Sequence, residues 1–200
     1  KIYPIKTGEK TIVADYIEKI PENSLSLYDR GFASFSLMYL LIHQEKTKHF
    51  VMRCKQEFNK EVSLFMQSSD KDLILNISPN YRAIHKMKEY GFKVFTHTTS
   101  KIRMIKVVLN TGETEGLLTN LYDQEVYKTD SFKKLYFMRW GIETNYNYDK
   151  NVFQLEQFSG HSVLSIEQDF YATTFVSNLQ NIIEKQSEPY LAIKNEKRKH

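Results

Sequence analysis

The sequence predicts an α/β protein in which a sheet flanked by helices is interrupted by a β-rich insertion. Helical and strand-like patterns alternate over residues 1–54, short apolar runs dominate residues 55–130, and helical patterns return from residue 131. This alternation favours a layered α/β fold over a helical bundle or a sandwich. We therefore expect one frame built from 1–54 and 131–186, an insertion at 55–130 and a polar tail at 187–200.

The first part of the frame is predicted to run helix, strand, helix, strand. Apolar residues recur at three- and four-residue spacing over 9–20, and Pro21 ends that helix. Residues 24–28 alternate leucine with serine and predict a short strand. A broad apolar surface over 34–45 predicts a largely buried helix, which the strand 49–54 follows.

The insertion is predicted to be mainly β. Its apolar runs are short and are separated by Asn, Gly and Ser; they lie at 62–66, 73–77, 94–98, 102–109 and 115–119. One helix is expected at 81–90, ahead of Gly91. Beyond the insertion, two long helices are predicted at 131–152 and 162–186.

Composition excludes several classes of protein. With 41% hydrophobic and 26% charged residues in 200, the chain has the balance of a folded globular protein. Its single cysteine, Cys54, excludes an internal disulfide, fits a reducing compartment and is expected to be a buried thiol at a strand end. The longest uncharged stretch, 32–44, is too short for a membrane helix, and we expect no signal peptide. The histidines lack zinc-site spacing, and the glycines form no phosphate-binding loop.

Residues 136–150 carry the most informative pattern. On one continuous helix, Tyr136, Arg139, Glu143 and Lys150 share a face, beside an apolar stripe that would pack on the core. An Arg and a Glu four residues apart are also common on solvated helices, so the pattern alone leaves a surface helix open.

The spacing Tyr-x2-Arg-x3-Glu-x6-Lys resembles the Y-R-E-K signature of the DDE transposases of the insertion-sequence-four family. Four further stretches are similar to that family in the same order, at 27–32, 50–53, 117–121 and 155–160. The resemblance covers most of residues 20–185. It implies an RNase H-like fold with a β-rich insertion before the last catalytic helix.

The resemblance also implies the chemistry. Asp29 and Glu143 would be catalytic and would ligate Mg²⁺ or Mn²⁺, with two ions, because such cations require converging carboxylate oxygens. Tyr136, Arg139 and Lys150 would bind DNA. Together, these residues would cleave the element's DNA ends and join the freed 3′-hydroxyl to target DNA, which is cut-and-paste transposition.

Three local assignments are less specific. From the sequence alone, Asp29 also fits a turn ahead of Gly31. Arg53, a single arginine near a strand end, is a weaker candidate for contact with the DNA backbone. Trp140 is expected to pack in the core rather than to stack on a base, because it lies beside the apolar stripe.

The implied partners are double-stranded DNA, both element ends and target, and a second copy of the chain in a synaptic homodimer; the implied location is the bacterial cytoplasm, with the nucleoid. The family's first aspartate has no counterpart here, since Asp15 lies in a helical pattern, and we expect that aspartate upstream of Lys1 in a longer chain. Two alternatives stay open: a catalytically inactive DNA-binding or interaction module with the same frame, and a Mg²⁺ nuclease that joins no strands.

The net charge of +4 averages over segments of opposite sign. Residues 79–109 contain seven Lys or Arg and one Glu, a local +6, interleaved with four aromatic residues. A basic surface with aromatic side chains is typical of contact with a nucleic-acid backbone. We therefore expect this segment to contribute DNA contacts beyond those of 136–150.

Overall fold

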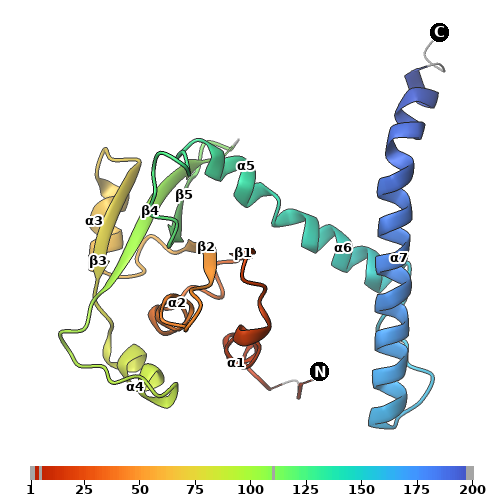
Figure 1. Cartoon of the computed structure of the whole chain (residues 1–200), viewed down its shortest axis with the longest axis horizontal. Coiled ribbons are helices and arrows are strands. Elements are labelled where there is room, and N and C mark those ends of the chain that lie inside the picture. Colours follow the sequence, from red (N-terminus) through yellow and green to blue (C-terminus); the bar gives the residue numbers. More distant parts are fainter. Residues whose placement is uncertain (1–2, 5, 110, 197–200) are drawn as a thin grey trace. The chain divides into compact units, whose positions relative to one another are not determined.

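The computed structural model describes residues 3–4, 6–109 and 111–196. The chain forms two compact units, which are described separately below (Figure 1). The first runs from Tyr3 to Arg139, and the second begins at Trp140.

A mixed sheet of five strands, flanked by helices, forms the first unit (Figure 1). Its order is β1-β2-β5-β4-β3, with β1 at Leu25–Tyr28, β2 at His49–Cys54, β3 at Asp72–Ile77, β4 at Ser100–Val108 and β5 at Thr114–Thr119. Strands β1 and β2 are parallel, whereas the other neighbours are antiparallel. The strands of the expected insertion therefore extend the sheet that β1 and β2 begin.

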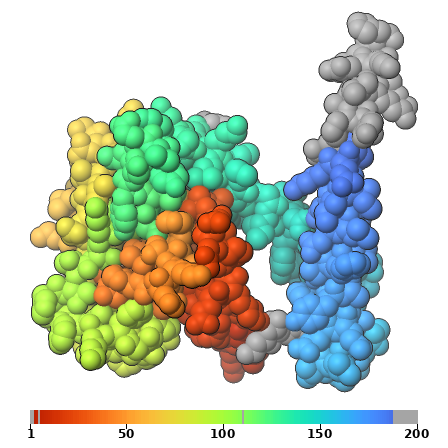
Figure 2. Space-filling view, viewed as in Figure 1, coloured from red at the N-terminus to blue at the C-terminus, as the bar shows by residue number. Residues whose placement is uncertain are grey.

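Six helical segments belong to this unit: α1 at Glu9–Asp15, the short 3₁₀ helix η1 at Ile17–Lys19, α2 at Phe35–Ile42, α3 at Lys60–Gln67, α4 at Tyr81–Glu89 and α5 at Ser131–Phe137. Ser34, Asn59 and Asn80 begin α2, α3 and α4, because each side chain accepts a hydrogen bond from a main-chain N–H three residues later. In Figure 2 the yellow-green residues of α4 lie against the orange residues of α2, with which they are in contact.

Apolar side chains cover both faces of the sheet. Phe50 and Met52 belong to the cluster formed with α2, α3 and α4, whereas Val51 belongs to a second cluster with Phe132 and Tyr136 of α5. Successive side chains on a strand point to opposite faces, so the consecutive apolar residues 50–52 of β2 serve both clusters. Helix α5 therefore packs on the face opposite to α2, which brings its end near the end of β1.

The prediction of an α/β fold with a mixed sheet and flanking helices is confirmed, but two segments of the insertion differ from it. Residues 62–66 were expected to be a strand and are helical, because Asn59 caps a helix in which Val62 and Phe65 turn inward. Residues 94–98 form a turn, closed by a hydrogen bond from Thr98 N–H to the carbonyl of Phe95.

The prediction of one continuous helix over 131–152 is also wrong, because the structure has two helices there. Helix α5 ends in a tight turn, in which the N–H groups of Met138 and Arg139 donate to carbonyls three residues earlier. A separate helix, α6, begins the second unit and runs Trp140–Asn151. Tyr136 and Arg139 thus lie before the break, and Glu143 and Lys150 after it.

Helix α7 spans Val163–Glu196 and pairs with α6 to form the second unit. Polar side chains join the two helices: Ser177 donates to Asp149 at 2.5 Å, and Asn181 donates to Asn145 at 3.1 Å. The segment expected as a polar tail is helical as far as Glu196; residues 197–200 lie outside the described part. In the described residues, no helix has the length and apolar character needed to cross a membrane.

Candidate functional site

Asp29 directly follows β1, at the end of the sheet where the parallel strands β1 and β2 both finish. In open α/β sheets, ligands bind at the carboxyl ends of parallel strands. Partial burial favours the neutral acid, but the backbone N–H of Arg30 and the charges of Arg53 and Arg139 outweigh it and lower the pKa of Asp29. The carboxylate is therefore ionised at neutral pH.

Arg53 and Glu115 complete a chain of ion pairs around Asp29. Arg53, near the end of β2, places Nη2 3.0 Å from Asp29 Oδ1 and donates from Nη1 to Glu115 Oε1 at 3.2 Å. Arg30 Nη2 donates to the same glutamate, at 3.1 Å from Oε1 and 3.4 Å from Oε2. Glu115 therefore accepts from two guanidinium groups that approach from different parts of the chain.

Sequence reasoning missed Arg30 and Glu115. Glu115 is the second residue of β5. The antiparallel register sets Leu117 opposite Arg53, which makes Glu115, two residues earlier on the same face, a diagonal neighbour of Arg53. A pairing across 62 residues of sequence leaves no local pattern. The only available signal was an acid at the start of an otherwise apolar run.

Tyr136 and Arg139 lie beside this cluster, in the same unit. The Tyr136 phenol donates a hydrogen bond to the main-chain carbonyl of Tyr28, 3.3 Å away, and burial raises the pKa of Tyr136 to about 12. The Arg139 guanidinium is buried, with its central carbon 5.7 Å from the Tyr136 ring centroid. Four of the six predicted site residues, Asp29, Arg53, Tyr136 and Arg139, therefore gather at the end of β1.

Glu143 and Lys150 belong to the second unit, in the first and last turns of α6. Glu143 is exposed. Lys150 Nζ lies 2.6 Å from Glu156 Oε1 and 4.8 Å from the Tyr146 ring centroid. The hydrogen bond with Glu156 raises the pKa of Lys150.

The apolar stripe expected beside Glu143 is not buried in this structure. Ile142 is 69% exposed, Tyr146 53% and Trp140 52%, so the expectation of core packing for Trp140 is wrong. In the first unit, half-buried Leu135 of α5 packs against the cluster on the sheet.

The basic segment 79–109 does not present all its charges to solvent. Arg103 is completely buried; it donates to Asp72 Oδ1 at 2.9 Å and Oδ2 at 2.5 Å, and to the carbonyls of Leu121 and Tyr127. Arg103 is thus excluded from a DNA-binding surface. The exposed basic side chains of the segment include Arg82, Lys88, Lys93 and Lys101.

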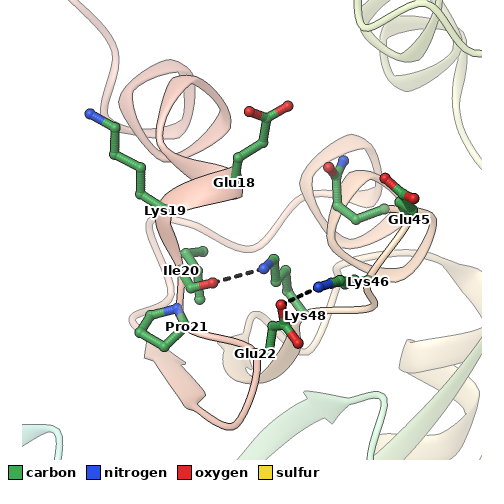
Figure 3. Close-up of a pocket in the computed structure, with 9 residues that line it drawn as sticks. Glu18, Lys19, Ile20, Pro21, Glu22, Glu45, Lys46 and Lys48 are labelled. Atoms are coloured by element: carbon green, nitrogen blue, oxygen red, sulfur yellow. Dashed lines mark hydrogen bonds and ion pairs between the residues drawn. The ribbon is translucent and has the colours of Figure 1, made fainter.

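A pocket of about 520 Å³ lies at the opposite end of β1, before the strand begins (Figure 3). Its charged lining balances three glutamates against three lysines; they are Glu18, Glu22, Glu45, Lys19, Lys46 and Lys48. Lys46 pairs with Glu22, and Lys48 donates to the carbonyl of Ile20 at 2.7 Å. The pocket is therefore separate from the cluster around Asp29.

Two further observations bear on chemistry. Cys54 is buried, as expected, and burial raises the pKa of its thiol to about 12. In the described ranges, no three or more His, Cys, Asp or Glu side chains form a group placed to hold a metal ion.

The sequence was also compared with known proteins. No model of a protein family matches the chain, and no curated protein matches it either.

Proposed function

We propose that the chain is a catalytic-domain segment of a DDE-type DNA transposase with an RNase H-like fold. The observation that carries the proposal is the gathering of Asp29, Arg53, Tyr136 and Arg139 at the end of β1. The resemblance selected these residues from separate stretches of sequence, and a hydrogen bond joins two of the stretches across 108 residues. A chance motif match gives no reason for its members to lie together.

The RNase H-like part of the proposal is supported by the sheet. The parallel strands β1 and β2 are joined through α2, and antiparallel strands continue the sheet. A carboxylate at the end of β1, with a helix from after the insertion packed nearby, is the arrangement that the resemblance implies.

Asp29 also has the chemistry of a metal ligand. Its Oδ1 atom is buried and lies 3.0 Å from Arg53 Nη2, and the carboxylate is ionised. A hard carboxylate oxygen of this kind suits Mg²⁺ or Mn²⁺. When bound, two such ions activate the attacking oxygen and stabilise the leaving oxygen of a phosphodiester.

The cationic groups have the chemistry of a DNA-backbone site. Arg53 presents a partly exposed guanidinium group beside Asp29, the guanidinium group of Arg139 is buried close to it, and Lys150 carries an ammonium group in the second unit. Arginine binds two phosphate oxygens at once, and such contacts position DNA without reading its sequence. Tyr136 would contribute indirectly, by fixing the end of β1, because its phenol already donates a hydrogen bond to the carbonyl of Tyr28.

One observation favours the inactive DNA-binding module as a second candidate. Arg53 supplies Asp29 with a positive charge from within the protein, at 3.0 Å, which a metal ligand ordinarily receives from the ion. If that ion pair is permanent, the cluster binds DNA without metal.

The test measures the affinity of the chain for a 30-base-pair duplex, with and without Mn²⁺. We expect Mn²⁺ to tighten binding about tenfold or more in the wild type and to have no effect in Asp29→Asn or Glu143→Gln. Asp70→Asn and Glu167→Gln change the charge equally and serve as controls, since neither side chain forms an ion pair within the described residues.

The outcomes separate the candidates. An equal Mn²⁺ response in all four variants would show that Asp29 and Glu143 are not ligands. DNA binding that no variant or metal alters would favour the inactive module.

A further inference from the structure

Glu115 makes with two arginines the contacts that a phosphate group would make. Its carboxylate accepts from Arg30 through both oxygens, at 3.1 and 3.4 Å, and from Arg53 at 3.2 Å. A guanidinium group binds carboxylate and phosphate in the same planar, two-point geometry. The Glu115 side chain is only 10% exposed, so these bonds form in a partly desolvated place.

The two arginines differ in how firmly they are held. Arg53 is 23% exposed and bridges Asp29 and Glu115, so it has a second carboxylate. Arg30 is 43% exposed, lies in the loop after Asp29, and pairs with Glu115 alone among the described residues. Arg30 is the more exposed of the two and has one carboxylate partner, so it can exchange that partner for a phosphate, whereas Arg53 is held by two carboxylates.

We propose that Glu115 is an internal competitor for phosphate: in the DNA-free chain it holds Arg30, and a phosphate of the DNA backbone takes Arg30 from it. This inference rests on the proposed function, because the phosphate must approach the end of β1. The exchange leaves Glu115 paired with Arg53, so no buried carboxylate is stranded. Arg30 is then a DNA-binding residue, and Glu115 lowers the affinity for DNA because it competes for Arg30.

The test replaces Glu115 with Gln, which keeps the shape and removes the charge. Duplex affinity should rise about tenfold in Glu115→Gln, measured in EDTA so that divalent cations do not contribute. Glu113→Gln is the matched control: it lies in the same hairpin, carries the same charge and is exposed, with no ion pair among the described residues. Its affinity should rise by less than about twofold, through long-range charge alone.

Arg30→Gln tests the same idea from the other side and does not depend on a buried substitution. It should lower the slope of log affinity against log salt by about one unit at most. In the double variant Glu115→Gln/Arg30→Gln, the gain from Glu115→Gln should disappear, because the released arginine is absent.

The results separate the inference from the proposed function. If the wild type binds duplex DNA but Glu115→Gln and Glu113→Gln tighten binding equally, or Arg30→Gln leaves the salt slope unchanged, the inference is overturned and the proposed function stands. If neither the wild type nor any variant binds DNA, both are overturned.

Discussion

The phenol of Tyr136 donates a hydrogen bond to the main-chain carbonyl of Tyr28 over 3.3 Å, which fastens α5 to the residue before Asp29. The bond spans 108 residues and is buried. It joins the first helix after the insertion to the edge strand of the sheet. The position of the candidate carboxylate thus depends on a helix far along the chain.

Removing this bond should weaken the fold without removing a DNA contact. We expect Tyr136→Phe to lower the free energy of unfolding by about 1 kcal/mol, because a buried carbonyl loses its donor. The salt slope of DNA binding should not change. Urea denaturation measures the first effect, with Tyr127→Phe, at a residue 40% exposed, as the control. A Tyr136→Phe variant as stable as the control would contradict this role.

We expect the fold to lose most stability when the buried guanidinium group of Arg103 is left without its carboxylate partner. Asp72→Ala removes two hydrogen bonds to a completely buried guanidinium, so the free energy of unfolding should fall by about 3–5 kcal/mol. Asp70→Ala, two residues away and exposed, should cost less than about 0.5 kcal/mol.

A double variant sharpens that prediction. Asp72→Ala/Arg103→Met removes the buried charge together with its partner and should unfold at a higher urea concentration than Asp72→Ala. If the double variant is less stable than the single one, the loss arises elsewhere.

Much of the fold follows from local sequence. Ser34 and Asn80 each precede an apolar pattern of helical period, and β2 is centred on the short apolar run 50–52, so these elements are predictable. The helix at 60–67 was missed because five apolar or small residues in a row fit a strand equally well, and the cap at Asn59 decided between them.

The site was predictable only in part. Asp29, Arg53, Tyr136 and Arg139 came from a motif resemblance, whereas Arg30 and Glu115 depend on strand register, which no local pattern encodes. The sequence places Arg103 in a basic segment that was expected to contact DNA, and nothing local indicates that this side chain is buried. Its burial follows from pairing β4 with β3, which brings Asp72 within reach.

Stability should fall in acid. Burial alone would raise the pKa of Asp72, but hydrogen bonds from Arg103, Thr129 and Gln124 outweigh it and lower the pKa below its ordinary value of 3.8. A carboxyl whose pKa is lower in the folded state stabilises the fold above the unfolded pKa and loses that contribution as the pH falls through the folded pKa.

The free energy of unfolding should therefore decrease between about pH 5 and about pH 2. Asp72→Asn is less stable at neutral pH, and its stability should vary less over this range because the titrating group is absent. Urea unfolding at a series of pH values measures this, with Asp70→Asn as the charge-matched control. Parallel curves for Asp72→Asn and Asp70→Asn would show that Asp72 does not contribute.

Cys54 should be unreactive while the chain is folded. Burial raises the pKa of the thiol to about 12, so the reactive thiolate is scarce at pH 8, and burial also restricts access to the sulfur. Mass spectrometry after iodoacetamide treatment should detect alkylation in urea and almost none in buffer. Equal rates in the two conditions would mean that the end of β2 is open.

We propose that Asp29 holds a divalent cation at the end of β1, and cleavage of the chain by bound Fe²⁺ tests this most directly. Iron that replaces Mg²⁺ generates hydroxyl radicals in the presence of ascorbate and peroxide, and these cut the nearest main chain. We predict cuts close to residue 29, suppressed by excess Mg²⁺ and absent in Asp29→Asn. No cuts near residue 29, or cuts there that persist in Asp29→Asn, would contradict this role.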